Sequence, residues 1–459
     1  MRVNRPGRPL HADDGRPRSS RWRIALLLSI GLGLTIPGEV AFAGEAKPAQ
    51  TLRVGTSGDY APFSIQAGPE DENWKPEGFD IDVARAYARD RGLQIEWVRF
   101  RWPDLMSDLE AKRFDIAMSG VTVRPERSLA GRFSVPVAHS GAVALVPEGS
   151  RLLALDRLDD AGVRIAVNRG GHLERVTRAH FPHAQIIAVS NNQAVLDTLA
   201  HHRADAVITD TLEAPHWKRR QPGVTQLGPF THDTKAYLMG RNPGALAADL
   251  DGWLLEREAD QALDGLRRRF LGHSLAPPPA EPVNALLAAI DERLGLMPGV
   301  AEAKRGSGGT VEDRKREAIV IERALEAARE ARPAGDPRTM NDSALRALFR
   351  AQIEAAKDIQ LAILASPPPD SVGKPADLHG ELRPALGRIG DRIAWLVVRM
   401  PENPSRASLR ERTRRALAKH GLSDARLAEI ADAIAGIRAT PEPRPPAQPP
   451  PPPRRGTVQ

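Results

Sequence analysis

Side chains suited to binding a flat, anionic ligand follow successive predicted strands in the first half of the chain. Tyr60 lies in the turn-rich segment GDYAPFS, and Trp102 lies in RWPDL, where an indole could stack on a ring. The segment SGVTVRPER carries hydroxyl groups and Arg127, whose guanidinium can form two parallel hydrogen bonds with a carboxylate. Each residue also has an ordinary interpretation, as a core aromatic or as half of a surface ion pair. Because loops at the carboxyl ends of strands bind ligands in open α/β sheets, together they predict an anion-binding cleft.

The segment NRGGHLE at 168–174 places a carboxylate beside free backbone amides. Its two glycines lead from a predicted strand into a predicted helix, whose N-terminus presents amide groups and a positive dipole end to an anion. Enclosure in a cleft would raise the pKa of Glu174, and the helix dipole would lower it. Two roles therefore stay open: a proton donor to the ligand, or an exposed first-turn residue that the helix dipole stabilises.

Basic residues recur at helical spacing in the second half of the chain. Arg293, Lys304 and Arg316 are eleven and twelve residues apart, about three turns each, which predicts one face of a long helix. Gln352 and Gln360 form a semi-polar stripe on another predicted helix. A basic residue that faces a helical core needs an anion to meet it. A solvated charged face is the alternative interpretation.

Composition excludes several classes of protein. The chain has 459 residues, with 65 Lys and Arg against 58 Asp and Glu, for a net charge of +7. Residues 1–43 hold seven arginines against three acidic residues, and residues 441–459 hold three against one, which leaves only +1 for the rest. A nucleic-acid-binding domain carries its positive charge on the folded part, so this class is disfavoured. The absence of Cys excludes disulfides and thiol chemistry, and we expect neither a metal nor a cofactor.

The first 43 residues are typical of a secretory signal peptide. Four arginines between positions 16 and 23 precede the apolar run IALLLSIGLGLTI, and the small residues AFA follow at 41–43. The run is shorter than the ~20 residues that a membrane span needs, which disfavours the alternative of an uncleaved anchor. We expect cleavage near Ala43 and a periplasmic or secreted protein.

Two regimes of secondary structure follow the signal peptide. Strand-like runs at 51–57, 93–100, 114–121, 163–170, 184–190 and 204–210 alternate with helical patterns at 79–92, 174–181 and 192–204. This alternation predicts a mostly parallel α/β sheet. The predicted organisation is a signal peptide at 1–43, an α/β domain at 51–274, a Pro-rich linker at 275–283, an all-α domain at 284–440, and a disordered Pro-rich tail at 441–459.

The α/β region resembles a known family. The motifs GTSGDYAPFS, GFDIDVA, RFDIAMSGVTVRPER, TDTLEA and TKAYL resemble the type-2 periplasmic amino-acid-binding fold, in which two α/β lobes close on a ligand. Within that fold, the resemblance is to the cyclohexadienyl dehydratases, which convert prephenate to phenylpyruvate or arogenate to phenylalanine. It implies that Arg127, with Thr122 and Ser119, binds a substrate carboxylate. It also implies that Tyr60 and Trp102 pack on the substrate ring.

The same resemblance implies roles for residues of the second lobe. Asp210 would occupy the position where amino-acid binders meet the ligand amine, and Lys235 would face the cleft. Glu174 would be the general acid that protonates the leaving hydroxyl as the ring carboxylate departs as CO2. The chain departs from the dehydratases at Thr234, where they would have an acid, and this leaves the preference between prephenate and arogenate open.

The helical region resembles the secreted, all-helical chorismate mutases of the gamma class. The segments ERLGLMPGVAEAK, VEDRKRE and AQIEAAKDIQ carry the likeness, which extends through LRPALGRIGDR. It implies that Arg293, Arg316 and Arg392 hold the two carboxylates of chorismate. It further implies that Lys304 and Gln360 donate hydrogen bonds to the ether oxygen, whose negative charge grows as the C–O bond breaks.

The resemblance also implies that Asp313 and Glu317 orient the ring hydroxyl of chorismate. Two positions depart from the mutase pattern. Ala356 stands where a Ser or Thr is usual, and Val320 stands where a Gln is common. Each change removes a hydrogen bond, so we expect a working mutase that is slower.

Together the two halves predict a bifunctional enzyme that converts chorismate to prephenate and then to phenylpyruvate or phenylalanine. The alternative is a solute-binding protein for an amino acid or aromatic acid, fused to a chorismate mutase. Glu174 separates these hypotheses, because a pure binder has little use for a carboxylate aimed at its ligand. A sensor module is disfavoured because the sequence shows no second membrane span. We expect small-molecule substrates as partners, with no nucleic acid and no stable membrane span after cleavage.

Overall fold

The structure, a computed structural model, describes residues 50–66, 74–333, 335, 340–367, 376–401 and 405–437. The predicted signal peptide at 1–43 and the predicted tail at 441–459 lie outside these residues. No helix within these ranges is both long enough and apolar enough to cross a membrane. The fold class predicted from the sequence, two α/β lobes followed by an all-α domain, is confirmed.

The first lobe is built on strand β1 (Thr51–Thr56), which has the parallel strands β5 (Gln94–Arg99) and β6 (Ile116–Ala117) on its two sides. The antiparallel strands β15 (Leu238–Gly240) and β7 (Gly131–Phe133) complete the sheet. The loops that leave β1, β5 and β6 all lie at one edge, because parallel strands end on the same side. Smaller elements of this lobe are β2 (Asp59–Tyr60), β3 (Ser64–Gln66), β4 (Pro76–Glu77), α1 (Phe79–Arg91), α2 (Leu105–Glu110) and α3 (Pro125–Ala130).

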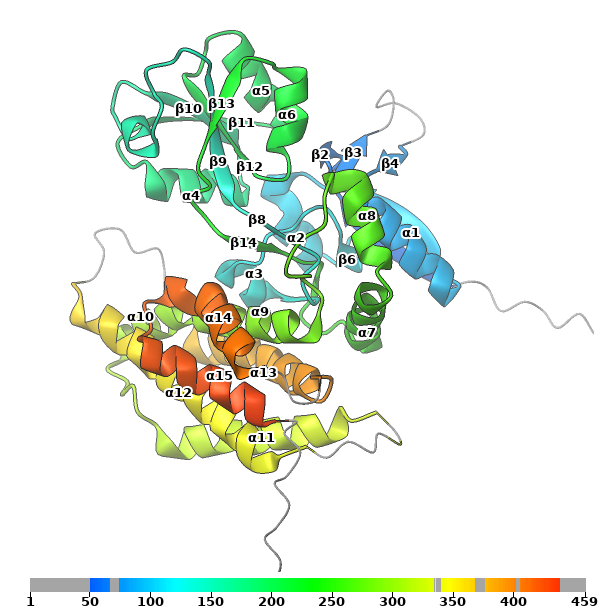
Figure 1. Cartoon of the computed structure of the whole chain (residues 1–459), viewed down its shortest axis with the longest axis vertical. Helices are drawn as coiled ribbons and strands as arrows, with labels where there is room; N and C mark the ends of the chain where they lie inside the picture. The colour runs from blue at the N-terminus through cyan, green and yellow to red at the C-terminus, as the bar shows by residue number, and fades with distance from the viewer. Residues whose placement is uncertain are drawn as a thin grey trace, which may run out of the picture. The chain divides into compact units, whose positions relative to one another are not determined.

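The second lobe has a sheet that helices cover on both faces (Figure 1). Its strand order is β11 (Gln185–Val189), β10 (Arg164–Asn168), β12 (Ala206–Asp210), β9 (Ala142–Pro147) and β13 (Val224–Leu227). Successive side chains of a strand point to opposite faces, so the residues of β9 contribute alternately to two cores. One core contains α5 (Asn192–Ala200) and α6 (Ala214–Arg220), and the other contains α4 (His172–His180).

The chain crosses between the lobes twice. It leaves the first lobe at β8 (Ala138–Ser140) and returns at β14 (Asp233–Lys235), and these two strands pair antiparallel (Figure 1). After β15 it forms α7 (Ala245–Ala259) and α8 (Ala262–Leu271). A double crossing lets side chains from both lobes meet at one cleft, which a single sheet could not arrange.

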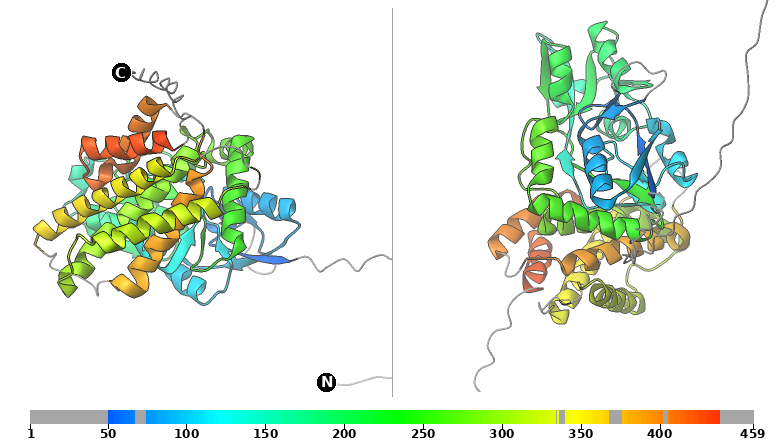
Figure 2. Two further views of the ribbon diagram at one scale, coloured as in Figure 1. Left: turned by 90° about the horizontal axis from the view of Figure 1, so that it is seen from below. Right: turned by 90° about the vertical axis from the view of Figure 1, so that its right-hand side faces the viewer.

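The rest of the described chain is helical. The long helix α12 (Asp342–Ala365) packs against its neighbours side by side (Figure 2). The helices that pack against α12 are α9 (Pro282–Gly295), α10 (Met297–Ser307), α11 (Arg314–Glu330) and α15 (Asp424–Gly436). The other helices of this region are α13 (Arg383–Val397) and α14 (Arg406–Leu417). A short π-helical turn, Leu378–Leu382, precedes α13.

The prediction that Arg293, Lys304 and Arg316 share one long helix is wrong. They lie on α9, α10 and α11, because two local signals break the helix. Pro298 lacks the amide hydrogen that a continuing helix needs, and α10 ends at Gly308, which has a φ of 68°. The three cations converge through packing of separate helices and not through helical periodicity.

A buried ion pair ties the end of the α/β domain to the chain that leads into the helices. Arg267 of α8 forms two hydrogen bonds of 2.7 Å with Glu258 of α7, and its Nε donates to the Val137 carbonyl at 3.0 Å. Glu258 also accepts a hydrogen bond from the Ala280 amide at 2.9 Å, just before α9. All polar atoms of this pair have partners, which is the condition under which a buried pair is tolerated.

We predict that Arg267→Ala lowers the free energy of unfolding by about 3–5 kcal/mol, because Glu258 is left charged and buried without its cation. Urea denaturation followed by tryptophan fluorescence measures the change. The control is Arg268→Ala, which removes an exposed pair with Asp264 and should change the same free energy by less than about 1 kcal/mol. Equal losses in the two variants would contradict the role given to Arg267.

Candidate active sites

The first candidate site is a cleft between the two lobes, at the carboxyl ends of strands from both sheets. The lining includes Tyr60 of β2, which follows β1, Trp102 after β5, Thr122 and Arg127 after β6, Asn168 at the end of β10 and His172 after it. The predicted grouping of strand exits is therefore present. The cavity has a volume of about 30 Å³, whereas ligand pockets usually hold ~300–1,000 Å³. A ring-sized ligand can enter only when the lobes separate.

Arg127 is the dominant charge of this cleft. It is 1% exposed, and its Nη1 donates to the Thr122 carbonyl at 2.9 Å. Its Nε is buried and has no hydrogen-bond partner, and no ion pair with a carboxylate forms within the described part of the chain. Burial lowers the pKa of its guanidinium well below the usual value. A buried cation in this condition needs an anion from outside the chain.

The aromatic residues of the cleft form a continuous cluster. The rings of Tyr60 and Trp102 meet edge to face with centroids 5.8 Å apart, and Trp102 makes a similar contact with Phe100. The Trp102 Nε1 donates to the Asp59 carboxylate at 3.1 Å. Trp102 is thus packed against the core and is also part of the cleft lining.

Asp210 and Lys235 lie behind the lining and not on it, which differs from the prediction. One Asp210 oxygen accepts two backbone amides, and the other accepts the Tyr60 hydroxyl and lies 3.1 Å from the Lys235 ammonium. Lys235 also donates to the Tyr60 hydroxyl at 2.8 Å and to the Thr122 hydroxyl at 3.0 Å. All of these groups are already engaged, so in this structure the pair positions Tyr60 and Thr122.

Ser119 also differs from its predicted contact with a substrate carboxylate. It is fully buried, and its hydroxyl accepts a hydrogen bond from the Ser57 amide at 3.1 Å and lies 2.9 Å from the Ser57 hydroxyl. These bonds join the loop after β1 to the loop after β6. Ser119 therefore fixes the spacing of two cleft loops from behind.

Glu174 is turned away from the cleft. Its carboxylate accepts the Gly170 amide at 2.7 Å and pairs with Arg178, one turn further along α4, at 2.9 Å. Partial burial raises the pKa of Glu174, but the Gly170 amide and Arg178 outweigh it, so that pKa lies below its usual range. In this structure Glu174 is an ionised first-turn residue, which is the alternative to the predicted general acid.

A residue that the sequence reasoning did not single out takes a place in the cleft. His172 lines it, two residues before Glu174, with its Nε2 2.9 Å from Asp233 of β14. Its Nδ1 is buried and unpartnered among the described residues. The signal was a histidine at the predicted start of a helix after a strand, but the Asp233 partner lies 61 residues away and only the fold brings it close.

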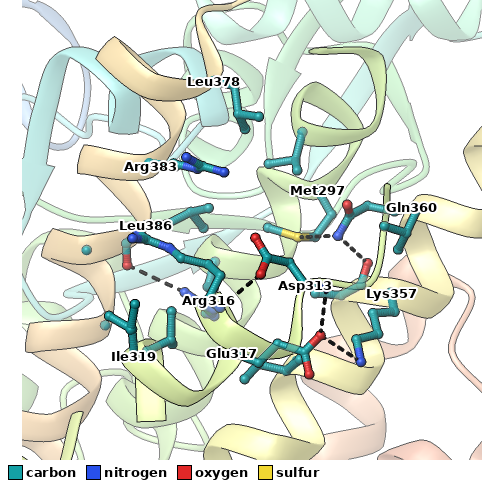
Figure 3. A pocket seen from close by; sticks show the side chains of 18 of the residues that line it. Met297, Asp313, Arg316, Glu317, Ile319, Lys357, Gln360, Leu378, Arg383 and Leu386 are labelled. Carbon is teal, nitrogen blue, oxygen red and sulfur yellow. Dashed lines mark hydrogen bonds and ion pairs between the residues drawn. The ribbon is translucent and has the colours of Figure 1, made fainter. Parts of the chain in front are cut away.

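The second candidate site is a cavity of about 440 Å³ within the helical domain. The predicted residues that line it are Arg293, Lys304, Asp313, Arg316, Glu317 and Gln360. Several of them point toward one another across the cavity in Figure 3. They come from four different helices and the N-terminal cap of α11. The volume falls in the range of ordinary small-molecule pockets.

Arg293 is the buried cation of this cavity, as Arg127 is in the cleft. Its Nη1 donates to the Leu386 carbonyl at 3.5 Å, and its Nε is buried without a partner in the described chain. Burial lowers the pKa of Arg293 to about 10. The guanidinium stays charged at neutral pH, and it has no acidic partner within the described ranges.

Lys304 and Gln360 face the same space. The Lys304 ammonium donates to the Val311 carbonyl at 3.2 Å, and burial, followed by the nearby Arg383, lowers its pKa. The Gln360 amide nitrogen donates to the Ala356 carbonyl at 2.9 Å, and its buried carbonyl oxygen has no partner among described residues. Ala356 and Val320 line the cavity as apolar groups, as expected from the departures in the sequence.

Asp313 and Glu317 also have structural contacts at this cavity (Figure 3). Asp313 caps α11 by accepting the Arg316 amide at 3.0 Å. Glu317 accepts the Asp313 amide at 3.3 Å and pairs with Lys357 of α12 at 2.9 Å. These bonds leave both carboxylates on the cavity wall with fixed positions.

Arg392 does not line the cavity, which corrects its predicted role. It is buried against the α/β domain, where it pairs with Glu292 and donates to the Phe133 carbonyl at 2.6 Å. Arg383, nine residues earlier on α13, lines the cavity instead. Nine residues are about two and a half turns, so the two arginines lie on opposite faces of the helix. Sequence spacing alone could have shown that only one of them can face a given site.

In comparisons with known proteins, the α/β region and the helical region match two different families. Residues 52–273 match the family of bacterial extracellular solute-binding proteins, family 3, and residues 284–361 match chorismate mutase type II. Cyclohexadienyl dehydratase of Pseudomonas aeruginosa is 36% identical over 266 residues, which cover 56% of this chain and 96% of that protein. The L-cystine-binding protein TcyJ of Escherichia coli K12 is 27% identical over 251 residues, which cover 54% of this chain and 93% of that protein.

A solved structure of an ancestral amino acid-binding protein, described as a precursor of cyclohexadienyl dehydratase, is 31% identical. It covers 48% of this chain and 95% of its own, with a TM-score of 0.45. The family match and the dehydratase relative cover the same α/β region, and the mutase match begins after it. The chain therefore belongs to the bacterial extracellular solute-binding proteins of family 3 and carries, after that domain, a chorismate mutase domain of type II.

Proposed function

We propose that this chain is a bifunctional enzyme that catalyses two consecutive reactions. The helical domain rearranges chorismate to prephenate, and the α/β domain converts prephenate to phenylpyruvate, or arogenate to phenylalanine. One observation carries the proposal: each domain holds a buried arginine without a carboxylate partner in the described chain, Arg127 in the cleft and Arg293 in the cavity. Each site can therefore bind a ligand that carries a carboxylate. The product of the mutase reaction, prephenate, is also the substrate of the dehydratase reaction.

In the mutase reaction the protein contributes restraint and charge. The rearrangement is unimolecular, so it needs neither a nucleophile nor a general acid. Arg293 and Arg316 hold the substrate carboxylates, and Arg383 takes the place first predicted for Arg392. Lys304 stabilises the negative charge that develops on the ether oxygen, at a position where a preorganised cation acts most strongly on the transition state. Gln360 lies beside it and donates the second hydrogen bond after its amide turns.

In the dehydratase reaction the cleft holds a carboxylate and excludes water. Arg127 and Thr122 bind the carboxylate, and Tyr60 and Trp102 pack on the ring. The C4 hydroxyl is a poor leaving group, so it must receive a proton while CO2 departs and the ring becomes aromatic. Closure of the lobes removes water from this step and strengthens the electrostatic contacts with the substrate.

Solute binding without catalysis is the second candidate function of the α/β domain, since relatives such as the L-cystine-binding protein share its fold. In an amino-acid binder a free carboxylate would meet the ligand ammonium. Here Lys235 and Tyr60 already engage Asp210, which favours the dehydratase over an amino-acid binder. We also propose that the mature protein starts near Gly44 and acts in the periplasm or outside the cell, in keeping with a family of extracellular proteins.

We expect the purified protein to produce phenylpyruvate from chorismate and also from prephenate supplied separately. Product analysis by chromatography, with and without each substrate, checks both activities. Accumulation of prephenate from chorismate, with supplied prephenate untouched, would show that the α/β domain only binds ligands. Unchanged chorismate would instead reject the mutase function.

We predict that Lys304→Ala lowers the kcat for chorismate by about 100-fold or more, because one preorganised donor to the ether oxygen is lost. Turnover of supplied prephenate should not change, since the cleft lies in the other domain. Lys315→Ala, which removes an exposed lysine at the start of α11, is the matched control and should leave both rates unaltered. A normal chorismate rate in Lys304→Ala would remove this residue from the site.

The two arginines of α13 should give different phenotypes. Arg383→Ala should lower kcat/KM for chorismate by about tenfold or more, because a charge-assisted contact to a carboxylate is lost. Arg392→Ala should lower the free energy of unfolding by about 3–5 kcal/mol, because Glu292 stays buried without its cation. Steady-state kinetics and urea denaturation of both variants separate the two effects. A loss of kcat/KM in Arg392→Ala together with a loss of stability in Arg383→Ala would restore the prediction from sequence that Arg392 holds a carboxylate.

A further inference from the structure

Lys357 of α12 lies in the wall of the helical-domain cavity, one residue after Ala356. Its side chain is 16% exposed, and its ammonium lies 2.9 Å from Glu317 of α11 and 2.9 Å from Glu354, one turn earlier on α12. Burial lowers the pKa of Lys357, but the two carboxylates outweigh it, so this pKa lies above its usual value. Lys357 is therefore a charged group that joins α12 to the start of α11.

The contacts of Glu317 converge on one of its two oxygens (Figure 3). Its Oε1 accepts the Asp313 amide at 3.3 Å and lies 2.9 Å from the Lys357 ammonium. Its Oε2 accepts no hydrogen bond within the described part of the chain. Since each carboxylate oxygen has two lone pairs, Oε2 can still accept a hydrogen bond from a ligand hydroxyl.

Two effects oppose a glutamate at this place in the cavity. Its side chain is 23% exposed, so it can adopt other rotamers, and fixing one of them costs free energy. Chorismate also carries two carboxylates, which repel an ionised glutamate. Lys357 offsets both effects, because it holds Oε1 in place and supplies a positive charge beside it.

We propose that Lys357 is a positioning residue of the mutase reaction, a role that rests on the proposed function of the helical domain. It holds Glu317 by Oε1, so that Oε2 accepts the hydrogen bond of the ring hydroxyl of chorismate. This contact restrains the ring, and restraint of the substrate is a main contribution of the protein to a unimolecular rearrangement. In this role Lys357 acts through Glu317 and not on the reacting atoms.

The first test measures kcat/KM for chorismate in variants of the full-length protein. Lys357→Met keeps the length of the side chain and removes its charge. We expect it to lower kcat/KM by about tenfold or more, because a hydrogen bond to a charged group is weakened. Lys357→Arg, which keeps the ion pair, should stay within about threefold of the unsubstituted protein.

The matched control is Arg350→Met. This change removes a cation from the same helix, but Arg350 is exposed and does not line the cavity. Its kcat/KM for chorismate should therefore stay unaltered.

A double-mutant cycle shows whether Lys357 acts through Glu317. Glu317→Gln should itself lower kcat/KM for chorismate. Adding Lys357→Met to Glu317→Gln should cost no more than about a further threefold, because the two residues support one contact. Losses that multiply would show that Lys357 acts independently of Glu317.

A second readout uses inhibition by a stable bicyclic dicarboxylate that mimics the transition state, with and without the ring hydroxyl. Lys357→Met should raise the inhibition constant of the hydroxylated compound by about tenfold or more. The constant of the compound without the hydroxyl should change by less than about threefold, because the contact that Lys357 supports is absent from it. A variant with a damaged helical domain would bind both compounds more weakly to the same extent.

The outcomes separate this inference from the proposed function. If the unsubstituted protein leaves chorismate unchanged, the mutase function fails and the inference fails with it. If that protein is active, three results overturn the inference alone. These are an unchanged kcat/KM in Lys357→Met, a loss that Lys357→Arg shares, and an equal rise in both inhibition constants.

Discussion

The burial of positive charge without a matching carboxylate is the constraint on which both sites depend. Arg127 lines the cleft of the α/β domain and Arg293 lines the cavity of the helical domain, each with a buried Nε that has no partner in the described chain. Burial alone lowers the pKa of Arg293, and it is the main cause for Arg127. Holding such a charge is unfavourable, so the surrounding structure must be stable enough to tolerate it until a ligand arrives.

In the α/β domain that stability comes from polar groups behind the cleft. Asp210 and Lys235 hold the Tyr60 and Thr122 side chains that line the cleft, and Ser119 joins two of the loops. Such supporting contacts keep a site within the narrow geometry that catalysis needs. Residues that the family resemblance places in contact with substrate thus act one layer further back in this structure, as long as the lobes are closed.

In the helical domain the cavity is held in place by hydrogen bonds at the start of α11 and by contacts of α13 with the α/β domain. Asp313 and Glu317 fix the start of α11 at the cavity wall. Arg388 of α13 donates to the carbonyls of Ser128 and Leu129 at the end of α3, the short helix that carries Arg127. A helix that lines the cavity of the helical domain therefore contacts the helix that carries Arg127, and the two candidate sites share part of their framework.

The sequence by itself determined the fold class, the change from α/β to helical architecture near 275, and part of the residues that line each cavity. The fold class and the change of architecture follow from local patterns, namely strand periodicity and helical spacing. The site residues follow from loop position and from the family resemblances. Only the tertiary structure decided which side chains line each cavity. His172 differs from Glu174 through Asp233, which is distant in sequence, and Arg383 differs from Arg392 through the domain that packs on the other face of α13. Such partners arise from packing between remote segments, which no local spacing encodes.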